Sequence, residues 1–158
     1  DSRIGGMEGA GLGLSMEYVE DRLESRRRAA RSYREALAGM GVRTVGPPPD
    51  FVENGYLNVT LIDPRLRPAV EAALRRDGIG FGTVYPGAMS EQPGAAGHLA
   101  AHVGGTTAAW LGRSVLNLPL FAHVRDDELQ AVLAAMRRAT LDAGFRSGPA
   151  GSFSSEQA

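Results

Sequence analysis

Apolar side chains recur along the chain with two spacings, and each spacing predicts a different kind of element. The helical spacing predicts helices over 14–39, through Val70, Ala73 and Leu74, over 106–113, and from Asp126 to Gly144. Short alternating runs predict strands over 42–45, 56–62 and 115–118, with a glycine-interrupted strand or loop over 79–85. This order predicts an α+β fold, with a small antiparallel-rich sheet that carries helices on one face.

Two of these helices have a clear apolar face. In the long helix 14–39, that face is formed by Val19, Leu23, Ala30, Tyr33 and Leu37. In the last helix, it is formed by Leu129, Val132, Leu133, Met136 and Thr140. The last helix also begins with three acidic residues, where the helix dipole favours negative charge. We expect both faces to point into the core.

Glycine dominates the start of the chain, at Gly5, Gly6, Gly9, Gly11 and Gly13. These glycines predict either a helix face that lets another backbone come close or a loosened helix start, because each costs ~1 kcal/mol in a helix. A dinucleotide-binding loop is a weaker interpretation, since no strand precedes them. The nearby Leu12, Leu14 and Met16 should be poorly covered, so we predict self-association through residues 4–20.

The composition excludes several kinds of chemistry. All 17 basic residues among the 158 are Arg, and neither Lys nor Cys occurs. The chain therefore cannot form a lysine Schiff base, complete a P-loop, or supply a thiol nucleophile or thiolate ligand. A net charge of −1 argues against a nucleic-acid partner. No apolar run approaches the ~20 residues that span a membrane and no secretory signal opens the chain, so we expect a cytoplasmic protein.

The three histidines are the remaining candidates for chemistry within the chain. His98 and His102 have the i,i+4 spacing of two metal ligands on one helix face, but no third ligand accompanies them, and we expect no metal site. His123 precedes the last helix, where it could cap the helix or line a pocket. An unrelated small α+β enzyme that uses these histidines stays open as an alternative.

A series of short motifs is more specific than any single residue. In chain order they are Ser2-Arg3, Met7-Glu8-Gly9-Ala10, Arg26-Arg27-Arg28, Tyr33 to Leu37, Gly78-Ile79-Gly80, Tyr85-Pro86, Gln92-Pro93, Leu116 to Phe121 and Asp126-Asp127-Glu128. In this order and spacing the chain resembles the C-terminal small domain of the DegT/StrS family of pyridoxal-phosphate-dependent sugar aminotransferases. The resemblance implies the small domain of a fold-type-I aminotransferase over 1–145 and leaves 146–158 as a disordered tail.

The resemblance also implies a function that this chain cannot perform alone. The lysine that binds the cofactor would lie in a large domain, and the partners would be that domain, a second subunit of a homodimer, and a sugar nucleotide. Ser2 and Arg3 would contact the cofactor phosphate, to which hydroxyl and guanidinium groups donate well. Tyr85 and Ser90 would contact the sugar. The reaction implied moves an amino group from an amino acid such as glutamate to a keto-sugar, in deoxyaminosugar biosynthesis.

Several positions depart from the family pattern. The family has Asn at Asp1, an acidic pair at Gly5-Gly6, and His at both Val84 and Ser90. A carboxylate at position 1 would repel a phosphate, and without the two imidazoles the family's sugar contacts cannot be copied onto this chain. These replacements favour a second hypothesis, a catalytically inactive relative that acts alone as a binding or scaffold module.

Overall fold

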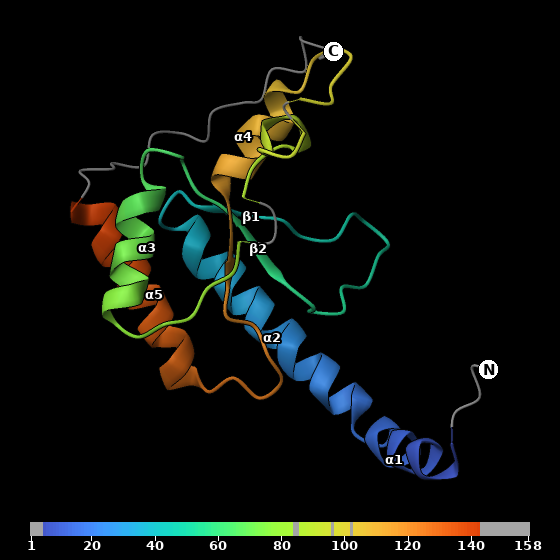
Figure 1. Cartoon of the computed structure of the whole chain (residues 1–158). Coiled ribbons are helices and arrows are strands. Elements are labelled where there is room, and N and C mark those ends of the chain that lie inside the picture. The colour runs from blue at the N-terminus through green and yellow to red at the C-terminus, as the bar shows by residue number, and fades with distance from the viewer. Residues whose placement is uncertain (1–4, 84–85, 96, 102, 143–158) are drawn as a thin grey trace.

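The chain alternates helices with short strands, and Figure 1 shows their arrangement. The computed structural model describes residues 5–83, 86–95, 97–101 and 103–142. The elements in chain order are α1 (Gly6–Met16), α2 (Val19–Ala38), β1 (Arg43–Thr44), β2 (Asn58–Leu61), α3 (Arg67–Arg76), the short 3-10 helix η1 (Met89–Glu91), α4 (Thr106–Ser114), β3 (Val115–Leu118) and α5 (Asp126–Asp142). The α+β prediction is confirmed.

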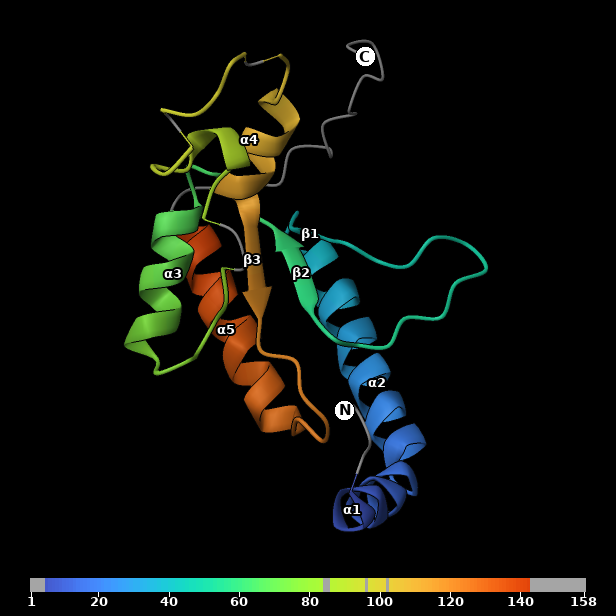
Figure 2. The same cartoon turned by 45° about the vertical axis from the view of Figure 1, so that its right-hand side comes forward.

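The three strands form one antiparallel sheet in the order β1–β2–β3. Thr60 at the centre of β2 pairs with Thr44 on one side and with Leu116 on the other. In Figure 2 the strands lie in front of α2 and α5, and α3 packs against α5. Helices therefore cover one face of the sheet, as the sequence predicts, and α4 runs directly into β3 at one end of it.

The core lies between the sheet and the helices that cover it. All five apolar-face positions predicted for α5 are buried, and so are Tyr33 and Leu37 of α2. Val70 and Leu74 of α3 are fully buried as well. Burial of this apolar surface is the main force that holds the helices against the sheet.

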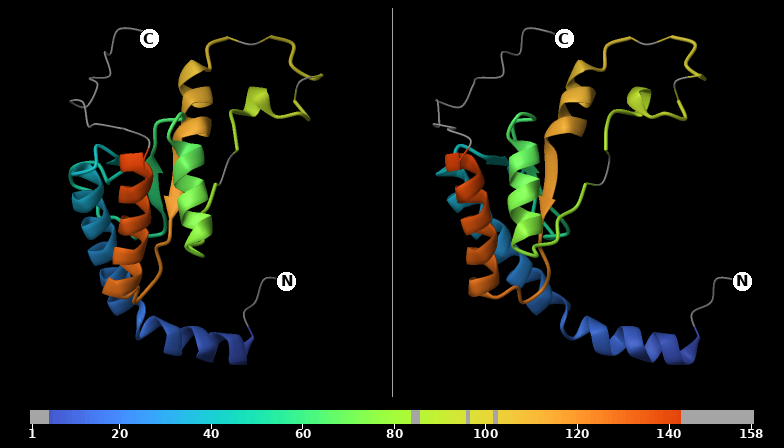
Figure 3. Two further views of the ribbon diagram at one scale, coloured as in Figure 1. Left: turned by 90° about the vertical axis from the view of Figure 1, so that its left-hand side faces the viewer. Right: turned by 60° about the vertical axis from the view of Figure 1, so that its left-hand side comes forward.

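The N-terminal helix differs from its prediction. Instead of one helix over 14–39, α1 ends at Met16 and α2 begins at Val19, so that α1 leaves the body at an angle (Figure 3). Glycine costs helix stability without forbidding helical geometry, and the N–H of Gly5 at the start of α1 is satisfied by the Glu8 carboxylate at 2.7 Å. No residue of α1 is buried, which confirms the expected exposure of Leu12, Leu14 and Met16.

Other predicted elements are shorter in the structure. The strands predicted over 42–45 and 56–62 shrink to β1 and β2, and the described part of 79–85 contributes only an isolated bridge at Gly82. The strand over 115–118 has its predicted bounds. Among the described residues, no helix is long and apolar enough to cross a membrane.

Candidate functional site

The structure describes one of the four residues predicted to contact cofactor or substrate. Ser90 lies in η1, where it is partly buried. Ser2, Arg3 and Tyr85 fall outside the described residues, as do the replaced positions Asp1 and Val84. Their predicted contacts stay predictions. The described part of the candidate site is therefore the segment 86–92, which carries Ser90, together with the elements that hold it.

The chain that leads into this segment is paired with β3 through its backbone. Gly82 N–H donates to Asn117 O at 2.9 Å, and Asn117 N–H donates to Gly82 O at 2.8 Å. Asn117 lies within β3 and is buried. This reciprocal pair fixes the position of the backbone immediately before Thr83.

Arg67, the first residue of α3, connects three parts of the chain. Its Nη2 donates to Thr83 Oγ1, and its Nη1 donates to the carbonyl oxygens of Gly112 and Arg113, each at 3.0 Å. Its Nε donates to Glu71 at 2.8 Å. The last carbonyl groups of a helix have no partner within the helix, so the guanidinium also caps the C-terminal end of α4, where positive charge is favourable.

Glu71 balances the charge of the partly buried Arg67. One carboxylate oxygen accepts from Arg67, and the other accepts from Arg75 at 2.8 Å. Burial alone would raise the pKa of Glu71, but the two guanidinium groups more than offset it and hold the pKa below its ordinary value. The side chain of Arg67 is 14% exposed, against 63% for Arg75, which also lies over the Phe81 ring.

The end of α4 holds the segment from its other side. A Cβ added at Gly112 would lie only 2.7 Å from the Cα of Gly87, so the two backbones meet where only glycine fits. Arg113 donates to Glu91 at 3.0 Å, and the second oxygen of Glu91 accepts from the N–H of Ala88 at 3.2 Å. The segment 86–92 is thus fixed to α4 at two points, and η1 lies beside α4 (Figure 2).

Two hollows flank this contact between the segment and α4. The larger is a cavity of about 550 Å³, whose walls include Pro86, Met89, Gln92, Leu111, Gly112 and Val115. The second measures about 390 Å³ and is lined by Arg67, Glu71, Arg75 and Arg113. Pro86 and Gly112 line both hollows, so an apolar space and a cationic space lie next to each other. Sequence patterns gave no sign of this pairing.

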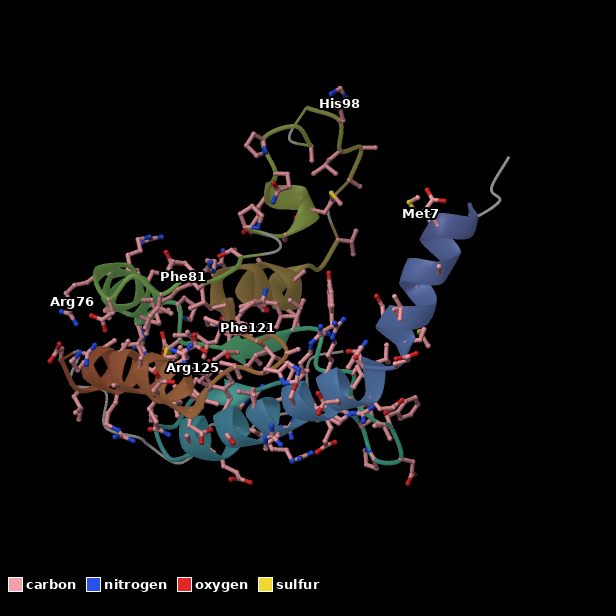
Figure 4. All side chains as sticks on the ribbon, turned by 90° about the horizontal axis from the view of Figure 1, so that it is seen from below. Met7, Arg76, Phe81, His98, Phe121 and Arg125 are labelled. Carbon is pink, nitrogen blue, oxygen red and sulfur yellow. The ribbon has the colours of Figure 1, made fainter. Side chains whose placement is uncertain are left out.

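The described histidines do not meet at a site. His98 is exposed at the outer end of the segment that precedes α4 (Figure 4). His123 follows the other end of β3, where its N–H donates to Ser25 Oγ and its Nε2 lies 3.4 Å from Asp21 Oδ2. His102 lies outside the described residues. Within the described ranges, no group of three or more His, Cys, Asp or Glu side chains could hold a metal ion.

The chain does not provide a complete site for pyridoxal phosphate. The aldehyde of that cofactor bonds to a lysine amine, and the sequence contains no lysine. Both hollows are formed without a lysine, and the two residues expected to bind its phosphate, Ser2 and Arg3, lie outside the described residues. Covalent binding of the cofactor therefore needs a residue that this chain does not contain.

Known proteins share both the sequence and the fold of this chain. A curated relative, the UDP-N-acetyl-3-dehydro-alpha-D-glucosamine 3-aminotransferase of Acidithiobacillus ferrooxidans, is 28% identical over 141 residues, 87% of this chain and 36% of the relative. The crystal structure of S. venezuelae DesV in complex with a ketimine intermediate matches with a TM-score of 0.74 at 25% identity. It covers 86% of this chain and 36% of DesV.

A second solved structure, of DesI in the presence of its TDP-sugar product, matches with a TM-score of 0.70 at 24% identity, over 87% of this chain and 36% of DesI. The chain thus spans about a third of the length of these relatives. Residues 1–137 match the model of a pyridoxal-phosphate-dependent family, the DegT/DnrJ/EryC1/StrS aminotransferases. This match excludes an unrelated histidine enzyme. The chain belongs to the DegT/DnrJ/EryC1/StrS aminotransferase family.

Proposed function

We propose that this chain is the small domain of a sugar aminotransferase that acts on a keto-sugar linked to a pyrimidine nucleotide. Of the named relatives, the Acidithiobacillus ferrooxidans enzyme is named for a UDP-linked sugar and DesI was solved with a TDP-linked one, and both nucleotides are pyrimidines. The amino donor would be an amino acid such as glutamate. The cofactor, bound in the complete enzyme, supplies the electron sink for amino transfer.

The observation that carries this proposal is the absence of lysine from a chain of an aminotransferase family. An active enzyme of a family that depends on pyridoxal phosphate needs a lysine, so under this proposal the chain would work beside a domain that has one. Its own contribution would be to shape the sugar side of the cleft and part of the contact with a second subunit.

Within that cleft, the chain's residues would position ligands. Ser2 and Arg3 would donate hydrogen bonds to the cofactor phosphate, and Tyr85 and Ser90 would bind hydroxyl or phosphate oxygens of the sugar nucleotide. The anchored segment 86–92 supports this role for Ser90, because a side chain held on a fixed backbone needs little ordering when a ligand binds.

A second candidate function, an inactive scaffold or binding module, is supported by the residues at Asp1, Val84 and Ser90, which differ from the family pattern. It requires that the protein works without a large domain. The two candidates therefore differ in what the coding sequence upstream of Asp1 contains.

The test is to determine that upstream sequence and assay the complete product. We expect an in-frame large domain with a Ser-x-x-x-x-x-Lys-type motif, and a product that transfers the amino group of glutamate to a UDP- or TDP-linked keto-sugar. As a control, the 158-residue chain mixed with pyridoxal phosphate should not develop the yellow absorbance of a lysine-bound cofactor. A start codon at residue 1 would refute the aminotransferase proposal and leave the scaffold.

A further inference from the structure

A further pocket lies at the opposite end of β3 from the segment 86–92. It measures about 430 Å³, within the range of roughly 300–1,000 Å³ that small-molecule sites occupy. Its walls come from α2, from the turn after α3, from the loop between β3 and α5, and from the first turns of α5. In Figure 2 that loop lies at the lower end of β3, and α4 lies at the upper end. None of the described residues that line this pocket also lines the hollows beside α4.

Hydrogen bonds within the chain fix two walls of this pocket. After α3, the N–H of Ile79 donates to Leu74 O at 2.9 Å. After β3, the N–H of His123 donates to Ser25 Oγ at 3.1 Å, and His123 Nε2 lies 3.4 Å from Asp21 Oδ2, which ties the β3–α5 loop to α2. These contacts form without a ligand, so a ligand would enter a preformed space and bind with little ordering of the protein.

The wall that α2 contributes carries a buried hydroxyl. Tyr33 lines the pocket and is fully buried, and its hydroxyl finds no hydrogen-bond partner among the described residues. Burial raises the pKa of Tyr33 to about 12, so the hydroxyl keeps its proton at neutral pH and can donate. A buried donor without a partner destabilises the folded state. A ligand with an oxygen at this wall would supply the missing acceptor.

A carboxylate lies at another wall of the pocket. Among the described residues that line it, Glu128 is the one that is charged at neutral pH, and its side chain is 36% exposed. Glu128 Oε2 accepts from the N–H of Arg125 at 2.9 Å, while the guanidinium of Arg125 donates to both carboxylate oxygens of Asp127. A carboxylate has about four acceptor positions, so an ammonium group can bind Glu128 without displacing the bond from the backbone of Arg125.

The rest of the wall is mainly apolar and includes Pro119, Val132 and the ring of Phe121, which is 46% exposed. We propose that this pocket binds a small aromatic amine that carries an oxygen on its ring, with the ammonium group at Glu128, the ring against Phe121 and the oxygen at the Tyr33 hydroxyl. Aromatic rings pack well on one another, and each end of such a ligand meets a polar group of matching kind. The proposal depends on residues of this chain alone, so its failure would leave the proposed function untouched.

Binding is measurable on the full 158-residue chain by isothermal titration calorimetry, with tyramine, phenethylamine, p-cresol and L-tyrosine as separate ligands. Phenethylamine lacks the ring oxygen and p-cresol lacks the ammonium group, so we expect each to bind about tenfold more weakly than tyramine. L-Tyrosine should also bind more weakly, because its carboxylate is repelled by Glu128. The proposal is overturned if p-cresol or phenethylamine binds as tightly as tyramine, or if tyramine does not bind at millimolar concentration.

Replacing Tyr33 by Phe tests the contact with the ring oxygen. The variant should bind tyramine only as tightly as it binds phenethylamine, and its affinity for phenethylamine should equal that of the wild type. The control is Tyr56→Phe, on a side chain that is 72% exposed, which should change neither affinity. Unchanged tyramine binding by Tyr33→Phe would overturn the proposal.

Replacing Glu128 by Gln tests the contact with the ammonium group. Glutamine can still accept from the N–H of Arg125, so the start of α5 should be kept. The variant should bind both amines about tenfold more weakly and p-cresol as the wild type does. Glu35→Gln, the same change on an exposed side chain of α2, should alter none of these affinities. Equal tyramine binding by the two variants contradicts the role of Glu128 and overturns the proposal.

Two neighbouring positions on α5 locate the site. Ala131 is exposed and lines the pocket, so Ala131→Trp should fill it, whereas Gln130 is exposed and lies outside the lining. A ligand that binds only the folded chain raises its Tm. Tyramine should therefore raise the Tm of the wild type and of Gln130→Trp but not that of Ala131→Trp. An equal rise in both variants would show that tyramine binds elsewhere and would overturn the proposal.

Discussion

Replacing Arg67 by Met should destabilise the chain far more than replacing Arg75 by Met, although both arginines bind the same carboxylate. The first change removes four hydrogen bonds of a side chain that is only 14% exposed and leaves two carbonyl groups at the end of α4 without their donor. Removing one partner of a buried ion pair costs about 3–5 kcal/mol, and partial exposure here favours the lower end, about 3 kcal/mol.

The matched change at Arg75 removes one hydrogen bond and a cation–π contact to Phe81 at 5.0 Å, both at a side chain that is 63% exposed. Contacts of that kind are worth about 1 kcal/mol together. The two variants should therefore differ by about 2 kcal/mol, or roughly 4–8 °C in Tm for a domain of this size.

Urea unfolding followed by circular dichroism measures the difference, with Arg67→Lys as a third variant. Lysine keeps the positive charge but lacks the planar guanidinium that donates several hydrogen bonds at once, so it should recover less than half of the stability lost in Arg67→Met. Hydrogen exchange of the amides in 86–92 should rise more in Arg67→Met than exchange in α5. If Arg67→Met and Arg75→Met lower the free energy of unfolding by the same amount, within about 0.5 kcal/mol, the role of Arg67 in holding Thr83 and the end of α4 is refuted.

Four other predictions follow from single features of the fold. Gly112→Ala should lower the free energy of unfolding by about 1–3 kcal/mol, because the added Cβ would lie 2.7 Å from the backbone of Gly87. In Gly11→Ala the added Cβ has no neighbour within 4 Å, so this control in α1 should raise the helix content. Urea unfolding measures the first effect and circular dichroism the second. Tyr33→Phe removes a buried hydroxyl that finds no hydrogen-bond partner among the described residues, so stability at pH 7 should stay equal or rise by about 1 kcal/mol. Burial also raises the pKa of Tyr33 to about 12, so the wild type should lose stability between pH 10 and 12 in unfolding titrations and the variant should lose less. Because the pKa of Glu71 is lowered from 4.5, its stabilisation is present above that pH and is lost in acid, and Glu71→Gln should show a shallower decline in acid unfolding. The exposed apolar side chains of α1 should make the chain self-associate, and a clean monomer in light scattering at high concentration would contradict this.

Sequence patterns predicted the elements whose side chains meet the core. In α5 and α3 every predicted apolar position is buried, and β3 has its predicted bounds. These elements could be predicted because side chains that face the core recur with the spacing of a helix or a strand, and the apolar residues in the sequence follow that spacing. The ends of elements were predicted less well. The glycines before residue 14 predicted a helix face or a loosened helix start, and the structure has a separate helix there, α1, instead of one helix over 14–39. Propensity shows the cost of glycine but not the capping contact from Glu8 that helps to offset it.

The anchors of the candidate site could not be predicted from the sequence for a physical reason. The acceptors of Arg67 include two backbone carbonyl groups that lie 45 and 46 residues further along the chain, and a carbonyl group is present at every residue. The close approach of Gly87 and Gly112 could not be predicted from the sequence either. The chain has 21 glycines, and nothing in the sequence distinguishes the one that faces another backbone. Only the fold brings these groups together.

The same anchors bear on the choice between the two candidate functions. Ser90, the described position of this segment that departs from the family pattern, is not among the residues that tie the segment 86–92 to α3 and α4. Replacing a side chain on a fixed backbone changes which ligand groups are contacted without moving the surface that presents them. Departures of this kind are expected of an enzyme with a different sugar. A module with a purely structural role would not need these anchors around a cavity next to Ser90, so they favour a ligand-binding role for this surface, as the aminotransferase proposal includes.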